Sequence, residues 1–189
     1  MIGDILLVAP GLGFEAIFPL GLSTLASALR RDGHACTGLD DRARPGCVEA
    51  ALKSIEALPP EKRPLAAVVE TSTRNVGSVI RLTERFAQLG IPVILIGTPA
   101  ATDPSAMMDS QDAFAAVTGD PETVVPALLR ELKARSGQPI AGARFRGPDS
   151  VIVSGVPDFT LDFADLEYDR TVFPLCDYSV HPRHPEFKQ

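Results

Sequence analysis

The residues best suited to binding chemistry in this chain are small or carry hydroxyl groups, and each follows a short apolar run. They are Pro10, Gly11, Ser72, Thr73, Gly97, Thr98 and Gly119. Glycine allows a ligand to approach the backbone closely, and serine and threonine hydroxyls can pair with amide and phosphate groups. The same residue types also suit tight strand–helix turns in any α/β protein, so composition alone does not identify a ligand.

The chain shows no arrangement of side chains that would support catalysis. No histidine is placed to activate Ser72, so nucleophilic catalysis finds no support. Cys176, His181 and His184 are metal-ligand types, but histidines flanked by prolines near a chain end are more often exposed to solvent. We therefore expect no catalytic residue and no metal site, and we expect His34 to lie in a surface turn.

Length and composition are typical of a globular protein, and the cysteine usage is typical of the cytoplasm. The 189 residues suffice for one domain with an appendage, and 45% of them are hydrophobic while 22% are charged. A net charge of −6 and a pI near 5.0 argue against binding to nucleic acid or anionic membranes. No apolar run approaches the roughly 20 residues of a membrane-spanning helix, and no basic region typical of a signal peptide opens the chain. Three cysteines without CxxC spacing indicate reduced thiols.

Five short apolar runs predict the strands of a parallel sheet. Amphipathic stretches separate these runs, which cover residues 4–9, 35–39, 65–70, 92–96 and 113–118. The runs at 65–69 and 93–96 are continuously apolar, as is typical of strands covered on both faces. Between them, apolar residues recur at helical spacing from Val76 to Ala87. Strands that alternate with helices in this way predict an α/β domain with right-handed crossovers.

The character of the sequence changes after the last of the predicted helices. Apolar residues in 140–145 and 151–153 flank a turn that contains glycine and proline, which predicts a β-hairpin. From Pro157 onward the hydrophobic residues show no sustained periodicity, which is typical of a linker or a strap across a surface. We therefore predict an α/β domain over residues 1–138 and a hairpin with an extended linker or strap over residues 139–189.

Residues 18–40 carry the most distinctive pattern, Phe-Pro-Leu-Gly-Leu-x-x-Leu-Ala-x-x-Leu-Arg-x-x-Gly-His, and they end on an aspartate. This pattern resembles the N-terminal cobalamin-binding domain of cobalamin-dependent radical S-adenosylmethionine enzymes. Segments at 91–102, 118–122, 140–153 and 165–174 are similar to that family in the same order, so the resemblance spans nearly the whole chain. It implies a flavodoxin-like (Rossmann-like) fold with a five-stranded parallel sheet of order 2-1-3-4-5, a C-terminal β-hairpin and an extended strap.

The resemblance also implies which residues meet the cofactor. Ser72 and Thr73 match the hydroxyl position that faces the dimethylbenzimidazole tail, and Gly97 matches the glycine that lets the tail pass beside the fourth strand. Pro10 and Gly11 match the loop beneath the corrin. We expect Gly97→Val to fill the slot for the tail and to abolish binding while leaving the fold intact.

Several positions depart from the family pattern. Gly119 matches the glycine after the fifth strand, but Asp120-Pro121 follows it in place of Glu-Gly. Thr98, which we also assign to the cofactor site, stands where a second glycine is usual and adds a side chain in a narrow slot. No Asp-x-His-x-x-Gly motif follows the first strand to supply a lower axial imidazole. The cysteines are too far apart for the Cys-x-x-x-Cys-x-x-Cys site of a [4Fe–4S] cluster, so we expect no iron–sulfur cluster and no radical chemistry from this chain alone.

With these departures, the resemblance predicts a corrinoid-binding module that is not catalytic by itself. The module would hold or present cobalamin to a radical S-adenosylmethionine enzyme, either a further domain or a separate subunit, most commonly for methyl transfer. Because the corrin would lie between the two, this chain offers half a site, and we expect weak binding without the partner. The apolar residues Leu12, Phe14, Ile17 and Phe18 would face that partner, or else fold down onto the helix ends.

Two other interpretations stay open. The first is a degenerate scaffold that keeps the fold, has lost the cofactor and binds a partner protein, and Thr98 suits it. The second is a dinucleotide-binding protein, because Gly11-Leu-Gly-Phe-Glu-Ala matches G-x-G-x-x-A after a strand and Asp40 would bind a ribose. Pro10 and Pro19 count against it, since they interrupt the turn and the helix that should follow at once.

Overall fold

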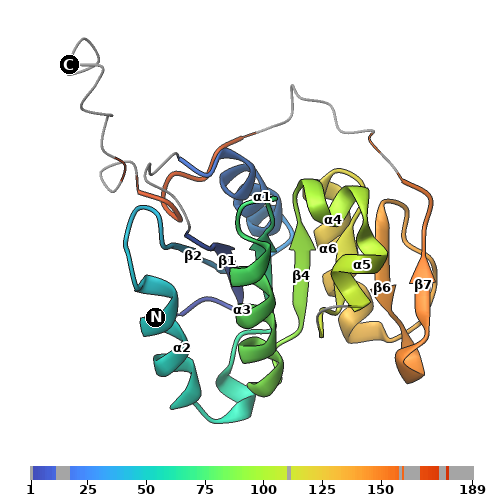
Figure 1. Cartoon of the computed structure of the whole chain (residues 1–189), viewed down its shortest axis with the longest axis horizontal. Coiled ribbons are helices and arrows are strands. Elements are labelled where there is room, and N and C mark those ends of the chain that lie inside the picture. Colours follow the sequence, from blue (N-terminus) through green and yellow to red (C-terminus); the bar gives the residue numbers. More distant parts are fainter. Residues whose placement is uncertain are drawn as a thin grey trace.

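The computed structural model of the protein describes most of the chain, namely residues 2–11, 18–109, 112–157, 159, 167–174 and 178. This part forms three layers, with helices on both faces of one central sheet (Figure 1). Outside the described residues lie several side chains singled out from the sequence: Leu12, Phe14, Ile17, Cys176, His181 and His184.

A seven-stranded sheet of order β2-β1-β3-β4-β5-β6-β7 forms the centre of the fold. The strands are β1 (Ile5–Ala9), β2 (Cys36–Asp40), β3 (Ala66–Glu70), β4 (Val93–Ile96), β5 (Ala115–Val117), β6 (Ala143–Arg146) and β7 (Ile152–Ser154). The first five are parallel in the order 2-1-3-4-5, which confirms the flavodoxin-like α/β prediction. β6 and β7 form the predicted hairpin, and they extend the same sheet because β6 pairs antiparallel with β5.

Helices cover both faces of the sheet, which explains why the central strands are apolar throughout. The helices are α1 (Leu20–Arg31), α2 (Cys47–Glu56), α3 (Val76–Gln88), α4 (Thr98–Thr102), α5 (Pro104–Asp109) and α6 (Pro121–Ala134), with 3₁₀ turns η1 (Pro60–Lys62) and η2 (Pro148–Ser150). α1 and α6 pack on one face and the other four helices on the opposite face (Figure 1). In β1, Ile5 and Leu7 join the apolar cluster of α1 and α6, while Leu6 and Val8 join the other cluster. None of the described helices has both the length and the apolar character needed to cross a membrane.

The turn between α1 and β2 shows that the surface prediction for His34 is wrong. His34 is buried, and its Nδ1 lies 2.6 Å from Oδ2 of Asp4. The second oxygen of Asp4 accepts a hydrogen bond from the backbone N–H of Ala35 at 2.6 Å. Gly33 has a φ of +88°, which lets the chain leave the helix and turn His34 inward. Through the contact of His34 with Asp4, the Gly-His pair of the sequence pattern therefore connects the end of α1 to the residue before β1.

Within the predicted strap, residues 167–174 and 178 pack beside α1 on the edge strand β2 (Figure 1). Val172 and Phe173 belong to the same apolar cluster as α1 and α6. Gly38 of β2 makes room for them, because a Cβ at this glycine would lie 2.5 Å from the carbonyl oxygen of Val172. Phe173 is only 1% exposed, so this part of the strap contributes to the core.

We expect Phe173→Ala to lower the free energy of unfolding by about 3 to 5 kcal/mol, because it empties a filled part of the core. Phe159→Ala is the matched control, since Phe159 is 69% exposed, and it should change stability by less than about 0.5 kcal/mol. Urea unfolding followed by circular dichroism measures both variants. Equal stability of the two variants would show that the strap is not docked on β2 in solution.

Candidate functional site

The predicted site residues all follow strands of the parallel part of the sheet. Because parallel strands end at a common edge, these residues belong to the loops at the carboxyl edge, where open α/β sheets bind their ligands. Ser72, Thr73, Gly97 and Thr98 are partly or fully exposed there, whereas Gly119 is buried. The edge therefore offers a ligand the loops after β3 and β4 most directly.

The loop after β3 is held rigidly while its hydroxyls stay available. Thr71 is buried, and both its N–H and its Oγ1 donate hydrogen bonds to the carbonyl oxygen of Ile96, each at 2.7 Å. Asn75 closes the turn, since its Oδ1 accepts from the N–H of Ser72 at 2.7 Å and its Nδ2 donates to the carbonyl of Glu70 at 3.1 Å. With the described residues, the Ser72 and Thr73 hydroxyls form no hydrogen bond. They remain able to pair with a ligand.

Gly97 is required by the backbone itself, which corrects the expectation for Gly97→Val. Its φ is +101°, a conformation that side-chain-bearing residues rarely adopt. A Cβ at Gly97 would lie 2.3 Å from the carbonyl oxygen of Thr71. The prediction that valine here leaves the fold intact is therefore wrong, because the side chain would collide with the β3 loop. Thr98 begins α4 and is exposed, so its side chain stands at the surface of the edge.

Gly119 lies beside Gly142, a residue with a structural reason to be small. A Cβ at Gly142, which precedes β6, would lie 3.1 Å from the Cα of Gly119, so the two backbones pack closely. The N–H of Thr118 donates a hydrogen bond to the carbonyl of Gly142 at 2.6 Å. The departure at Asp120-Pro121 starts α6, with Asp120 before the helix and proline at its first position.

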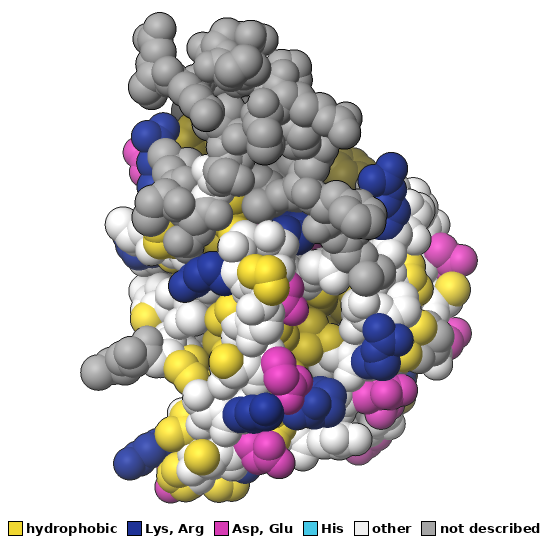
Figure 2. Space-filling view, turned by 60° about the vertical axis from the view of Figure 1, so that its left-hand side comes forward, with side chains coloured by type: hydrophobic (Ala, Val, Ile, Leu, Met, Phe, Trp, Pro, Cys, Tyr) yellow, Lys and Arg dark blue, Asp and Glu magenta, His cyan; other side chains and the backbone are white. Residues whose placement is uncertain are grey.

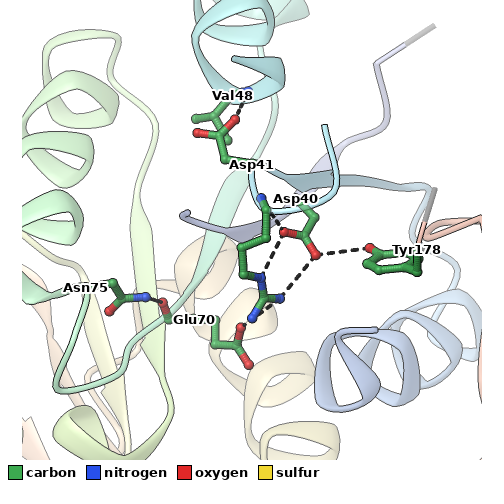
Figure 3. A network of polar contacts seen from close by, with 7 residues as sticks. Asp40, Asp41, Val48, Glu70, Asn75 and Tyr178 are labelled. Atoms are coloured by element: carbon green, nitrogen blue, oxygen red, sulfur yellow. Dashed lines mark hydrogen bonds and ion pairs between the residues drawn. The ribbon is translucent and has the colours of Figure 1, made fainter. Parts of the chain in front are cut away.

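A network that the sequence analysis did not find lies at the ends of β2 and β3 (Figure 3). Asp40 is 1% exposed, and its Oδ1 accepts from the N–H and Nε of Arg42 at 2.9 and 3.0 Å. Its Oδ2 accepts from Nη2 of Arg42 and from the hydroxyl of Tyr178, both at 3.1 Å. The same Nη2 lies 3.5 Å from Oε2 of Glu70. Because β1 lies between β2 and β3, this Asp40–Arg42–Glu70 bridge spans the carboxyl end of β1.

The charges of the bridge depend on one another. Burial raises the pKa of Glu70, the positive charge of Arg42 lowers it, and the carboxylate of Asp40 raises it, so that the pKa lies above its usual value. Burial lowers the pKa of Arg42, but the hydrogen bond and charge of Asp40 and the charge of Glu70 outweigh it, and the pKa is raised. Arg42 is thus the cation that keeps two carboxylates together at this edge.

The engagement of Asp40 argues against the dinucleotide-binding interpretation. That interpretation requires a carboxylate that accepts hydrogen bonds from ribose hydroxyls. Both oxygens of Asp40 already accept two hydrogen bonds each, from Arg42 and Tyr178, and the side chain is buried.

A groove of about 310 Å³ opens between α2 and α3, and Pro10 and Gly11 form its end at the carboxyl edge. Figure 2, in which this side of the molecule comes forward, shows hydrophobic side chains in a hollow bordered by charged ones. Arg85 and Glu49 approach each other to 3.4 Å at this border. Among the described residues, none of the other predicted site residues lines the groove. Pro10 and Gly11 therefore face a different hollow from the loops after β3 and β4.

Comparisons with known proteins identify structures of the same fold. No protein-family model matches the chain, and no curated protein sequence matches it. The radical S-adenosylmethionine methyltransferase TsrM from Kitasatospora setae, solved with cobalamin and a [4Fe–4S] cluster bound, superposes with a TM-score of 0.66 at 20% identity over 87% of this chain. The cobalamin-dependent S-adenosylmethionine radical enzyme OxsB, solved with aqua-cobalamin bound, gives 0.67 at 14% identity over 90%. The fold is shared with these enzymes.

The shared part is a small fraction of each enzyme. This chain covers 30% of the TsrM chain and 25% of the OxsB chain. At this level of identity the likeness shows the fold alone, and the residues of the edge must be judged by their own contacts. Within the described part of the chain, no cluster of three His, Cys, Asp or Glu side chains could hold a metal ion.

We expect Arg42→Met to lower the free energy of unfolding by about 3 kcal/mol at pH 7.5, because it leaves the buried Asp40 without its cation. The loss should become smaller at pH 5. Arg42 is the group that lowers the pKa of Glu70, so without it that pKa rises further, and protonation of Glu70 then relieves the repulsion between the carboxylates. Arg74→Met, at an exposed arginine of the β3 loop, is the control and should change little at either pH. Urea unfolding at both pH values provides the measurement, and a loss independent of pH would contradict this account of the bridge.

Proposed function

We propose that this chain is a corrinoid-binding module that takes cobalamin at the carboxyl edge of its sheet. The observation that carries the proposal is the superposition of nearly the whole chain on TsrM and OxsB, both solved with cobalamin bound. The exposed loops after β3 and β4 support it, because they present the hydroxyls of Ser72 and Thr73, which have no partner among the described residues, beside an exposed glycine backbone. A corrinoid carries peripheral carboxamides and a phosphate, which such groups can bind.

The residues present fit a corrinoid that is held by its periphery. Ser72 and Thr73 would donate hydrogen bonds to it, and Gly97 and Thr98 would let it approach the start of α4. When bound, cobalamin supplies a cobalt centre able to carry a methyl group. His34 is the one histidine among the described residues, and it is paired with Asp4 in the turn before β2, away from the carboxyl edge. No described imidazole would therefore meet the lower face of the cobalt.

We also propose that the module presents its cofactor to a radical S-adenosylmethionine domain or subunit, with methyl transfer as the reaction. The basis is that the chain matches 25–30% of enzymes whose remaining parts are absent from it, and that TsrM is a methyltransferase. Leu20, at the start of α1, is 52% exposed and would lie at the contact with such a partner. A site completed by a second component binds its ligand more weakly when that component is missing.

A scaffold without cofactor is the second candidate function. It stays a candidate because the carbonyl of Thr71 requires a small residue at Gly97 whether or not a ligand binds. The glycine at position 97 therefore does not by itself distinguish a corrinoid site from a scaffold that binds a partner protein.

Thr73→Trp tests the proposed site while sparing the fold, since Thr73 is exposed and makes no described hydrogen bond. We expect the wild-type chain to bind hydroxocobalamin saturably in an absorbance titration, and the variant to bind about tenfold more weakly or worse. The control is Ser54→Trp, at an exposed residue near the end of α2, which should bind as the wild type does. The natural chain has no tryptophan, so quenching of the introduced indole by the corrin gives a second readout.

Absence of saturable binding by the folded wild-type chain would favour the scaffold. Equal affinities of Thr73→Trp and Ser54→Trp would instead show that the corrinoid binds elsewhere.

A further inference from the structure

Besides the core packing of Val172 and Phe173, two polar anchors fix the strap to the domain, and the first lies on α1. The N–H of Asp169 donates a hydrogen bond to the carbonyl of Ser23, and the hydroxyl of Ser23 donates to the carbonyl of Asp169, each at 3.0 Å. The buried carboxylate of Asp169 lies 2.6 Å from Nη2 of Arg30 and accepts from the N–H and hydroxyl of Thr171 at 2.9 and 2.6 Å. The described contacts of this anchor are with Ser23, Arg30 and Thr171, and none of these residues is a member of the Asp40–Arg42–Glu70 bridge.

The second anchor is Tyr178, which joins the strap to the bridge. Its hydroxyl donates to Oδ2 of Asp40 at 3.1 Å (Figure 3). Its ring meets the ring of Phe18 edge to face, with centroids 5.3 Å apart and an interplanar angle of 77°. Phe18 lies two residues before the start of α1, in the connection between β1 and α1. Tyr178 thus contacts the carboxyl-edge ends of both β2 and the β1–α1 connection.

A continuous series of contacts leads from this anchor to the loop after β3. Oδ2 of Asp40 is shared by Tyr178 and by Nη2 of Arg42, and the same Nη2 is paired with Glu70. Glu70 ends β3, and the carbonyl of Glu70 accepts from Asn75, whose Oδ1 fixes the N–H of Ser72. Arg42 is 21% exposed and Glu70 is 33% exposed, so the bridge also presents a donor and an acceptor at the edge.

We propose that Tyr178 is a positioning residue that couples docking of the strap to binding of the corrinoid. With the strap docked, the Tyr178 hydroxyl holds Asp40, and Asp40 in turn fixes Arg42 and Glu70 beside the Ser72–Thr73 loop, where they meet the carboxamides of the ligand. Without the hydroxyl, Asp40 loses one of its two partners at Oδ2, and the guanidinium of Arg42 is less tightly held. This inference rests on the proposed function, because it concerns the affinity of the same site.

Thermodynamic linkage makes the coupling measurable from both ends. If docking of the strap raises the affinity for cobalamin, cobalamin must stabilise the docked strap by the same factor. The strap amides report docking through hydrogen exchange, and this readout does not depend on any enzymatic activity.

The test compares Tyr178→Phe with Tyr168→Phe, which changes the other tyrosine of the chain, one that is 51% exposed. We expect Tyr178→Phe to weaken binding of hydroxocobalamin by about fivefold or more, and Tyr168→Phe to leave it unchanged. Hydroxocobalamin should slow hydrogen exchange of residues 167–174 in the wild type and in Tyr168→Phe. The slowing should be smaller in Tyr178→Phe.

Asp169→Asn separates docking of the strap from a local effect at Asp40, because its anchor lies on α1. We expect it to speed exchange of residues 167–174 and to weaken hydroxocobalamin binding as well. Faster exchange with unchanged affinity would overturn the coupling, as would equal affinities of Tyr178→Phe and the wild type. No binding by the folded wild type would overturn the proposed function and this inference together, whereas wild-type binding with unaffected variants would overturn this inference alone.

Discussion

The carboxylate of Asp40 is buried at the end of the edge strand β2, and the arrangement of the carboxyl edge follows from the need to compensate its charge. Arg42 supplies the compensation through a bidentate contact, and its second interaction, with Glu70, carries the pairing across β1 to β3. The Oδ2 atom of Asp40 also accepts a hydrogen bond from Tyr178, which lies near the C-terminal end of the sequence. One buried charge therefore links the ends of β2 and β3, on either side of β1, with the strap.

The same edge shows how a fold and a ligand can require the same small residues. Gly97 has to be glycine because its φ is positive and the carbonyl of Thr71 fills the space of a side chain. Gly142, which precedes β6, also has to be small, because a Cβ there would lie 3.1 Å from the Cα of Gly119. The side chains that a ligand would distinguish are instead those without a structural task among the described residues, the hydroxyls of Ser72 and Thr73. These hydroxyls, and not the glycines, are the informative positions for the proposed site.

The sequence predicted the elements that local physics determines. A continuously apolar strand such as Val93–Ile96 must be covered on both faces of the sheet. Amphipathic helices between such strands therefore predict a parallel sheet, and the structure confirms it. The turn residues between β6 and β7 predicted the hairpin, but pairing of β6 with β5 depends on a long-range contact that no local pattern encodes.

The bridge was missed for a related reason. Arg42 and Glu70 are ordinary charged residues in sequence, and only the strand order brings them together across β1. Tyr178 lies in a segment whose hydrophobic residues follow no helical or strand periodicity, so their spacing does not predict where the segment packs. His34 gave the opposite error, because a turn residue next to glycine is usually exposed, and its pairing with Asp4 requires β1 and β2 to lie side by side.

The central claim is that the carboxyl edge of this sheet, at the loops after β3 and β4, binds a corrinoid. A titration of the ¹⁵N-labelled chain with diamagnetic hydroxocobalamin, followed by amide NMR spectra, tests both the binding and its place. The account predicts saturable shifts concentrated in residues 70–75 and 97–98, with little change in the amides of β6 and β7. Unchanged spectra at saturating cobalamin, or shifts confined to the groove between α2 and α3, would contradict it.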